Sequence, residues 1–195
     1  THTTEAFAGS SRTQDNSQNV VAVGEEIKKQ LEAAGFGVVH DTTCHDYPSY
    51  NGSYDRSGET IQRNLEKYPD IQVTLDVHRD AMGTQDGMRI KPTALINGKK
   101  AAQVMIISGC DDDGTLGFPN WEYNLRLGVR IQKSLSDLYP GLARPLSFCP
   151  KKYNEHMTKG SLLVEFGTEV NTLEEVKYSG QLFGKALAET LEQLT

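Results

Sequence analysis

The chain has 195 residues and a net charge of −6, with 37% hydrophobic and 24% charged residues. This length fits one domain with a sizeable core, and the composition is that of an ordinary globular protein. The acidic excess and the lack of a Lys/Arg run argue against a nucleic-acid scaffold. No apolar stretch approaches the ~20 residues of a membrane span. The three cysteines are widely spaced and fit neither a disulfide framework nor a zinc knuckle.

The first half of the chain predicts helices and strands in alternation. Apolar residues in 19–34 recur at three- and four-residue steps, which is typical of an amphipathic helix. Residues 37–41 are typical of a short strand, and a loop rich in turn-forming residues follows. Residues 60–69 predict a helix closed by proline. The segment 71–80 alternates apolar and polar residues and is rich in β-branched side chains, so it is expected to be a strand.

The second half continues the same alternation. Residues 93–109 predict two strands around an Asn-Gly turn, and a long helix is expected over 120–139. The segment 161–167 is a near-continuous apolar run, as in a strand buried on both faces. The chain closes on a helix, with Thr172 as its cap and Glu175 at the capping-box position.

Strands that alternate with helices predict an α/β fold, with a mostly parallel central sheet flanked by helices on both faces. No internal repeat, low-complexity tract or linker divides the sequence, so a single catalytic domain is expected over residues 1–195. The chain opens directly on a polar motif, HTTE, which suggests a domain excised from a longer protein.

Four polar residues are expected to meet at one edge of this sheet. His2 and Glu5 stand in the opening motif, His78 ends the strand 71–80, and Glu165 lies near the end of the strand at 161–167. Ligands of open α/β sheets collect at the carboxyl ends of the strands. Two histidines and a carboxylate are zinc ligands that leave one position open, and a further carboxylate can move a proton to a leaving amine. The pattern therefore predicts a mononuclear zinc hydrolase.

Each of these residues also has a plainer interpretation. A histidine and a glutamate three residues apart arise by chance on loops, and His78 can be a hydrogen-bonded residue at a strand end. Glu165 is the most informative, because a carboxylate within an apolar strand is costly to bury without a partner. His40, Cys44 and His45 form a competing set of ligands in a turn-rich loop.

The segments THTTEAF, LDVHRDA and SLLVEFGTEVNTLEE, in this order, resemble the stage II sporulation protein P family of peptidoglycan amidases. More broadly, the chain resembles the zinc-dependent N-acetylmuramoyl-L-alanine amidases, whose fold is related to zinc carboxypeptidases. The resemblance implies cleavage of the amide between N-acetylmuramic acid and L-alanine of the stem peptide during engulfment. It also implies an extracytoplasmic, membrane-anchored protein at the sporulation septum, working with the lytic transglycosylase stage II sporulation protein D.

By this resemblance, His2 and His78 correspond to the two histidine ligands of one zinc ion, and Glu165 to the catalytic glutamate. The acidic ligand departs from the family pattern. The wider amidases place a glutamate at the start of the first helix, where this chain has QDNSQN with Asp15 as its carboxylate. Glu5 fits the spacing of the carboxypeptidase relatives and is the preferred ligand, with Asp15 as the alternative.

A substrate groove is expected along the loop CHDYPSYNGSYDR and the segment KKYNEH. The residues predicted to contact substrate are Arg79, His45, Tyr50, Tyr54 and His156. Arg79 has two equal interpretations: it neutralises a substrate carboxylate or the oxyanion, or it pairs with Asp80 or Asp76. Likewise, His156 in its polar loop contacts substrate or is simply solvated. Two other functions compete with the amidase: a zinc carboxypeptidase-like peptidase, which needs an arginine for a terminal carboxylate, and a non-catalytic cell-wall-binding module.

Overall fold

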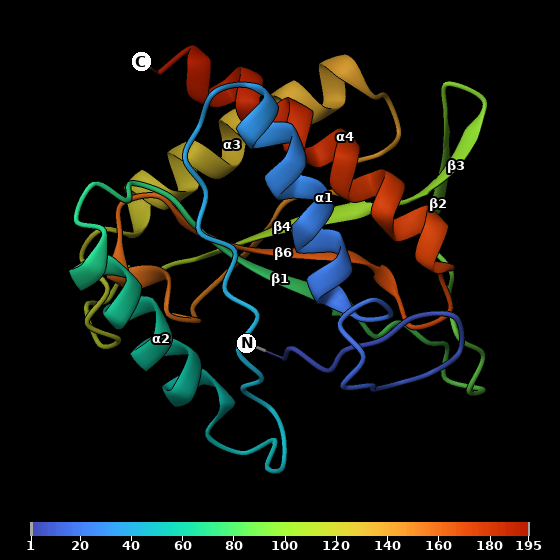
Figure 1. The fold of residues 1–195 in the computed structure, drawn as a ribbon, viewed down its shortest axis with the longest axis horizontal. Helices are drawn as coiled ribbons and strands as arrows, with labels where there is room; N and C mark the ends of the chain where they lie inside the picture. The colour runs from blue at the N-terminus through green and yellow to red at the C-terminus, as the bar shows by residue number, and fades with distance from the viewer. Residues whose placement is uncertain (1, 195) are drawn as a thin grey trace.

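The computed structural model describes residues 2–194, which form helices packed on a central sheet (Figure 1). The elements in chain order are α1 (Val20–Ala33), α2 (Ser53–Lys67), β1 (Thr74–Asp80), β2 (Thr93–Ile96), β3 (Lys99–Ala102), β4 (Val104–Gly109), α3 (Trp121–Leu138), β5 (Ser147–Cys149), the short 3-10 helix η1 (Glu155–Met157), β6 (Ser161–Thr168) and α4 (Leu173–Glu192).

The central sheet has the strand order β1-β6-β4-β5. The β1–β6 and β4–β5 pairs are parallel and the β4–β6 pair is antiparallel, so the predicted mostly parallel sheet is confirmed. Strands β2 and β3 form a separate hairpin that projects from one end of the molecule (Figure 1). Its turn has positive φ at Asn97 and Gly98, which is the backbone geometry that an Asn-Gly turn favours.

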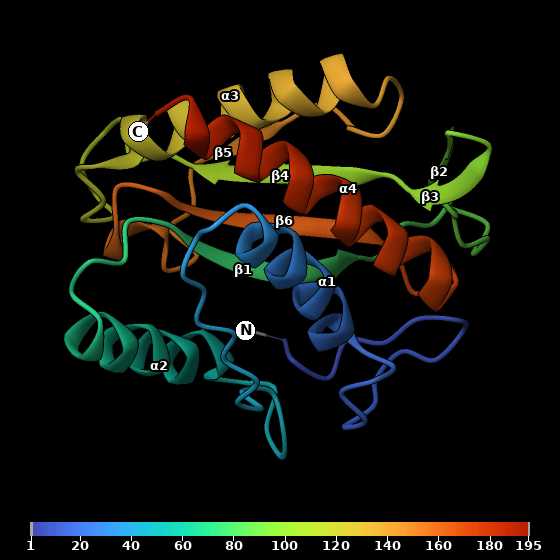
Figure 2. The same ribbon diagram turned by 45° about the horizontal axis from the view of Figure 1, so that its top comes forward.

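The hydrophobic core lies between the sheet and the helices α1, α3 and α4, which Figure 2 shows together on one side. Leu162, Val164 and Phe166 of β6 point into this core, and the Phe166 ring packs edge-on against Phe183 of α4. Full burial of such side chains contributes about 1.5–3 kcal/mol each. Successive side chains of a strand alternate between faces, so Glu165 points to the opposite side of the sheet. Helix α2 lies on this opposite side, apart from the other three helices (Figure 2).

Both α1 and α4 begin with a side-chain cap, and the capping box predicted for α4 is confirmed. The Asn19 side chain accepts a hydrogen bond from the backbone N–H of Val21 at the start of α1. At α4 the Thr172 hydroxyl accepts from the backbone N–H of Glu175, and the Glu175 carboxylate accepts from that of Thr172. This reciprocal pair satisfies two backbone donors that have no partner inside the helix.

Three element predictions are corrected. Residues 37–41 are not a strand, because this extended segment has no neighbouring strand with which to pair. Helix α2 begins at Ser53 rather than at residue 60, and Asp55 in its first turn complements the helix dipole. The segment 93–109 contains three strands, because β3 ends before Gln103 and β4 then joins the central sheet.

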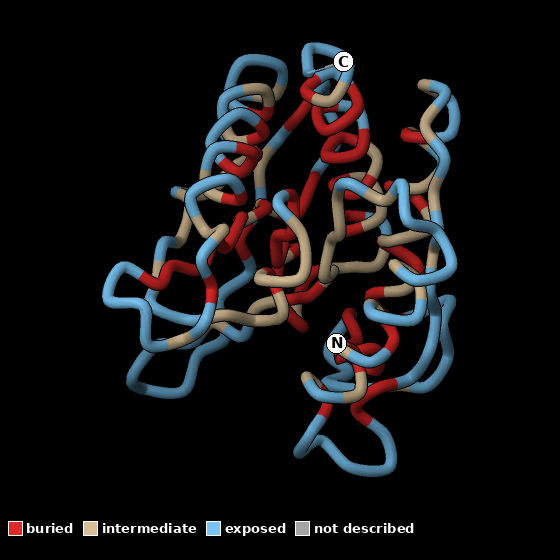
Figure 3. Tube along the Cα trace, turned by 90° about the vertical axis from the view of Figure 1, so that its left-hand side faces the viewer, coloured by how far each residue is buried: buried red, intermediate tan, exposed pale blue. Residues whose placement is uncertain are grey.

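Buried residues run through the centre of the domain, while exposed residues cover the loops at its periphery (Figure 3). Among the helices of residues 2–194, none combines the length and the apolar character that a bilayer crossing requires.

Candidate metal centre and active site

Two histidines and one glutamate converge at a single point. His2, Glu5 and His78 are buried, and one potential ligand atom from each lies within 4.8 Å of the others. The Nδ1 atom of His2 lies 3.4 Å from Oε1 of Glu5, and Nδ1 of His78 lies 3.4 Å from Oε2 of the same carboxylate. Both rings therefore direct the same nitrogen at one carboxylate, which is a donor set that suits zinc.

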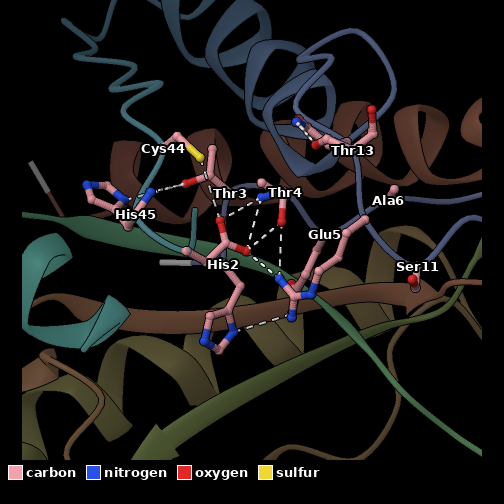
Figure 4. Close-up of polar contacts among 12 residues, drawn as sticks. His2, Thr3, Thr4, Glu5, Ala6, Ser11, Thr13, Cys44 and His45 are labelled. Carbon is pink, nitrogen blue, oxygen red and sulfur yellow. Dashed lines mark hydrogen bonds and ion pairs between the residues drawn. The ribbon is translucent and has the colours of Figure 1, made fainter. Parts of the chain in front are cut away.

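His2 and Glu5 belong to a loop that Arg79 fastens to the sheet. The backbone N–H of Arg79 donates to Oε2 of Glu5 at 3.0 Å. Its guanidinium donates to the carbonyl oxygens of Ala6 at 2.9 Å and Ser11 at 2.6 Å. Figure 4 shows His2 to Ala6 as one run, with Ser11 beyond it. Because His78 and Arg79 are adjacent on β1, one strand supplies a candidate ligand and also holds the loop that carries the other two candidates.

The opposite side of the same loop is held by the segment 43–46. The carboxylate of Asp46 accepts from the backbone N–H and the hydroxyl of Thr4, at 3.0 Å and 2.7 Å, and forms an ion pair with Arg12. The Thr3 hydroxyl donates to the carbonyl oxygen of Thr43 at 2.9 Å. The loop that carries His2 and Glu5 is thus held from both sides by hydrogen bonds.

The electrostatics of the cluster favour a positive charge at its centre. Burial disfavours ionised Glu5, but hydrogen bonds from His2 and His78 outweigh it and hold the pKa of Glu5 well below its usual range. Burial also disfavours protonated His78, yet Asp76 and Glu5 outweigh that effect and raise the pKa of His78 to about 10. The carboxylates of Asp76 and Glu5 thus favour a positive charge at this point. A metal cation would supply that charge in place of the proton on His78, so these residues fit a bound cation.

Asp76 contacts the candidate ligand His78 on the side away from Glu5. Its Oδ1 atom lies 3.1 Å from Nε2 of His78, the ring nitrogen that faces away from Glu5, as an ion-pair contact rather than an aligned hydrogen bond. Carboxylates in this position fix the orientation of metal-binding histidines. Asp76 is a further candidate site residue that the sequence interpretation did not name, although two residues on one strand share a face and the spacing to His78 carries that signal.

Glu165 lies beside the cluster on the neighbouring strand. It is in direct register with His78 in the β1–β6 pair, so the two side chains stand next to each other on the same face. Burial is the main cause that raises the pKa of Glu165 to about 8, and Glu5 raises it further while His78 opposes the shift. Its Oε2 atom is buried and has no hydrogen-bond partner among residues 2–194. A carboxyl group of this kind can accept and return a proton.

Tyrosine rings surround the two histidines. Tyr50 stacks on His2 at a ring distance of 4.6 Å, and the Tyr54 ring lies edge-on to His2 at 5.4 Å. Tyr54 is also parallel to His78 at 6.4 Å and contacts Tyr153 at 5.7 Å. Tyr50 and Tyr54 were predicted to contact substrate, and the structure places both rings against the histidines of the cluster. Tyr153 lies in the segment KKYNEH, which was expected to line the substrate groove, although Tyr153 itself was not singled out.

The other predicted contact residues lie in different surroundings. The guanidinium of Arg79 is engaged by backbone carbonyls and lies 3.8 Å from Glu169, whereas Asp80 pairs with Arg144 at 2.7 Å. These contacts support a structural role for Arg79, but its partners are backbone carbonyls and Glu169 rather than the expected carboxylates of Asp80 or Asp76. The ring nitrogens of buried His45 lie 3.5 Å and 3.0 Å from threonine hydroxyls. His156 lines a groove beside α2.

The alternative ligands do not join the cluster. Asp15 is exposed, and its carboxylate accepts from the backbone N–H and the hydroxyl of Ser17. His40 lies 3.3 Å from the Glu25 carboxylate, while His45 turns toward threonines, so the two histidines of the HDTTCHD segment have separate partners. Among residues 2–194, the group of potential metal ligands is His2, Glu5 and His78.

The fold is that of the N-acetylmuramoyl-L-alanine amidases. The CwlD amidase from Clostridioides difficile, solved in complex with the GerS lipoprotein, aligns with a TM-score of 0.54 and 10% identity over 89% of this chain and 82% of that one. The amidase AmiC2 of Nostoc punctiforme gives 0.52 and 10% over 89% and 81%. The apo amidase from Mycobacterium abscessus gives 0.55 and 13% over 98% and 82%. The fold and the cluster together define an amidase-fold protein with a candidate metal centre.

The particular family follows from the sequence comparison. The model of the Stage II sporulation protein P family matches residues 1–188, and the chain belongs to that family. It is 30% identical over 172 residues to Stage II sporulation protein P of Bacillus subtilis (strain 168), an alignment that covers 82% of this chain. The chain spans about two fifths of the length of that relative, since the match covers 40% of it.

Proposed function

We propose that the protein is a zinc-dependent peptidoglycan hydrolase of sporulation, which cleaves the amide between N-acetylmuramic acid and L-alanine of the stem peptide. The observation that carries this proposal is the convergence of His2, Glu5 and His78 with Glu165 in register beside them. The family and the amidase fold support the same reaction class.

Each residue has a distinct role in this reaction. His2, Glu5 and His78 would hold the metal, and Asp76 would keep the His78 ring in place. A zinc ion held there would polarise a carbonyl group and lower the pKa of a coordinated water toward ~7. Glu165 would take up a proton from the attacking water at its free carboxylate oxygen and return it to the departing alanine nitrogen. Tyr50 and Tyr54 would exclude bulk water from the histidines.

The two other functions receive less support. A carboxypeptidase-like enzyme needs an arginine that is free to bind a terminal carboxylate, and the guanidinium of Arg79 is engaged by backbone carbonyls. A non-catalytic wall-binding module has no reason to keep the buried, unpartnered Oε2 atom of Glu165 beside three potential metal ligands.

The proposal extends to the setting of the reaction. We place the protein outside the cytoplasmic membrane at the sporulation septum, as an excised catalytic domain of a membrane-anchored chain. The lytic transglycosylase stage II sporulation protein D is the proposed partner, because the two enzymes would cut the peptide and glycan bonds of one polymer.

The test measures bound zinc and hydrolysis of intact cell-wall sacculi on the same preparations. Glu165→Gln is expected to retain zinc and to lose activity by about 10²–10⁴-fold, the usual contribution of general acid–base catalysis. Glu5→Ala is expected to lose zinc, and Asp15→Ala is the matched control that keeps it. Activity retained in Glu165→Gln would overturn the mechanism, and zinc lost in Asp15→Ala would overturn the ligand set. Release of single terminal residues instead of whole stem peptides would identify a carboxypeptidase.

A further inference from the structure

An arginine of α2 holds the loop that covers the candidate ligand His2. We propose that Arg56 is a positioning residue: it fixes residues 45–51, here called the 45–51 loop, so that the Tyr50 ring lies on the His2 ring and keeps that ring in place. This inference rests on the proposed function and adds to it a residue that acts through Tyr50 and not on the substrate.

The guanidinium of Arg56 is bonded to three backbone carbonyls of one loop. Its Nε atom donates to the carbonyl oxygen of His45 at 2.7 Å, and its Nη1 atom donates to that of Asn51 at 3.1 Å. Its Nη2 atom donates to the carbonyl oxygen of Ser49. A planar fork with five donors can bond to three separate carbonyls, whereas an ammonium group at the end of a lysine cannot match this geometry. Arg56 therefore fixes the loop near both of its ends and in its middle.

The start of α2 is shaped to admit this guanidinium. Gly52, which precedes the helix, has a φ of 77°, in the left-handed region that glycine favours. A Cβ at this position would lie 3.2 Å from Nη1 of Arg56, so a side chain here would press on the arginine. The next backbone N–H, of Ser53, donates to the carbonyl oxygen of Tyr50 at 3.2 Å. Tyr50 is thus tied to the helix that carries Arg56.

Tyr50 connects these hydrogen bonds to the candidate metal centre. Its ring stacks on the His2 ring at 4.6 Å, with an angle of 21° between the planes. The guanidinium of Arg12 also lies over the Tyr50 ring, at 4.9 Å. Because Tyr50 is 54% exposed, the hydrophobic core does not hold its ring. The position of the ring depends instead on the backbone of the 45–51 loop.

His2 has a particular need for such support. Its Nδ1 atom faces Glu5, itself a candidate ligand, and its Nε2 atom is buried without a hydrogen-bond partner in the described range 2–194. The other candidate histidine, His78, has the Asp76 carboxylate 3.1 Å from its Nε2 atom. Metal-binding histidines are usually oriented by a polar group at the ring nitrogen that does not bind the metal. Since His2 has no such group outside the cluster, ring packing by Tyr50 is left to orient it.

The experiment measures how fast diethylpyrocarbonate modifies the His2 ring in the metal-free protein, with the modified peptides quantified by mass spectrometry. Arg56→Lys keeps the charge but cannot bond to the three carbonyl oxygens together. We expect the His2 rate to rise about three- to tenfold, the factor that corresponds to the loss of one aromatic ring contact. His40, which contacts Glu25 on α1, is the internal reference and should keep its rate. Arg130→Lys on the exposed face of α3 is the matched control and should leave both rates unchanged.

A double-variant comparison distinguishes positioning through Tyr50 from a general structural role. Tyr50→Leu removes the ring and leaves the carbonyl acceptors of Arg56 in place, so R56K/Y50L should react no faster at His2 than Tyr50→Leu alone. Additive increases would refute the proposal, and so would an unchanged His2 rate in folded Arg56→Lys. If Arg56→Lys does not fold, Gly52→Ala disturbs the same guanidinium, and an unchanged His2 rate there would be equally decisive against the proposal.

Zinc affinity, measured by competition with a chromophoric chelator, separates this inference from the proposed function. Arg56→Lys should weaken zinc binding about 10–100-fold, the range found for groups that orient a metal-binding histidine. Failure of the unmodified protein to bind zinc would overturn the zinc-dependent function, while the His2 rates would still decide the role of Arg56. A faster His2 reaction with full zinc affinity would show that Arg56 holds the loop without positioning the ligand, which contradicts the proposal.

Discussion

Glu155 offers a test of the wall of the groove beside α2 through the pH dependence of stability. Glu155 lies within residues 152–157, and only 2% of its surface is exposed. Burial is the largest cause that raises the pKa of Glu155 from 4.5 to about 8, against the opposing hydrogen bonds from the N–H groups of Gly109 and Leu163. The substitution Glu155→Gln keeps an oxygen for these donors and removes the titration.

The sign and size of the effect follow from proton linkage. Between pH 4.5 and 8 the folded protein holds a proton on Glu155 that the unfolded chain has lost, so the free energy of unfolding falls as pH rises. At 1.36 kcal/mol per pKa unit, Glu155 should remove about 3 kcal/mol of stability between pH 4.5 and pH 7. The Glu155→Gln variant should lack this part of the slope.

Urea unfolding at pH 4.5, 6 and 7 measures the difference directly, with the free energy of unfolding taken from the midpoint and the slope. The exposed Glu66→Gln is the matched control, and its curves should follow those of the unmodified protein. If Glu155→Gln and the unmodified protein lose stability in parallel as pH rises, the carboxyl group is not held neutral and the reasoning fails.

Two further substitutions test the parts that hold the site together. Arg79→Lys keeps the charge but cannot bond to the carbonyl oxygens of Ala6 and Ser11 together, so it should lower stability by about 3 kcal/mol and weaken zinc binding; zinc affinity equal to that of the unmodified protein would show that Arg79 does not hold the loop. Gly109→Ala would place the new Cβ against the carbonyl oxygen of Lys151, so the free energy of unfolding should fall by about 1–3 kcal/mol. Thermal unfolding measures this change. An unchanged melting temperature would show that the backbone at Lys151 can move to make room.

The parts of the fold that sequence patterns predicted are those that local chemistry determines. The helices α1 and α4 have strong apolar periodicity and recognisable caps, and both appear where expected. Glu165 could be singled out from the sequence for a related reason, because a carboxylate among buried apolar residues is costly to bury without a partner.

The remaining features depend on contacts between distant segments. Residues 37–41 have the composition of a strand, but a strand exists only where another pairs with it. The partners of Arg79 lie about 70 residues earlier in the chain, and those of Asn154 about 100 residues earlier. The positive φ of Tyr153 is imposed by its surroundings, because a bulky residue does not favour it. Such features arise from tertiary packing and leave no local signal.

The division of the metal cluster between a loop and a strand has a consequence for how the protein assembles. His2 and Glu5 must find His78 across more than 70 residues, and closing so long a segment is entropically costly before any contact compensates it. The cluster therefore joins segments that are distant in the sequence, and its geometry depends on the packing of this loop against β1. A cation that binds the finished cluster and not the open chain adds about 2.7 kcal/mol at a hundred times its dissociation constant. Such a cation would add to the hydrogen bonds by which Arg79 and Asp46 already hold this loop, so the metal-loaded protein should resist unfolding more than the metal-free one.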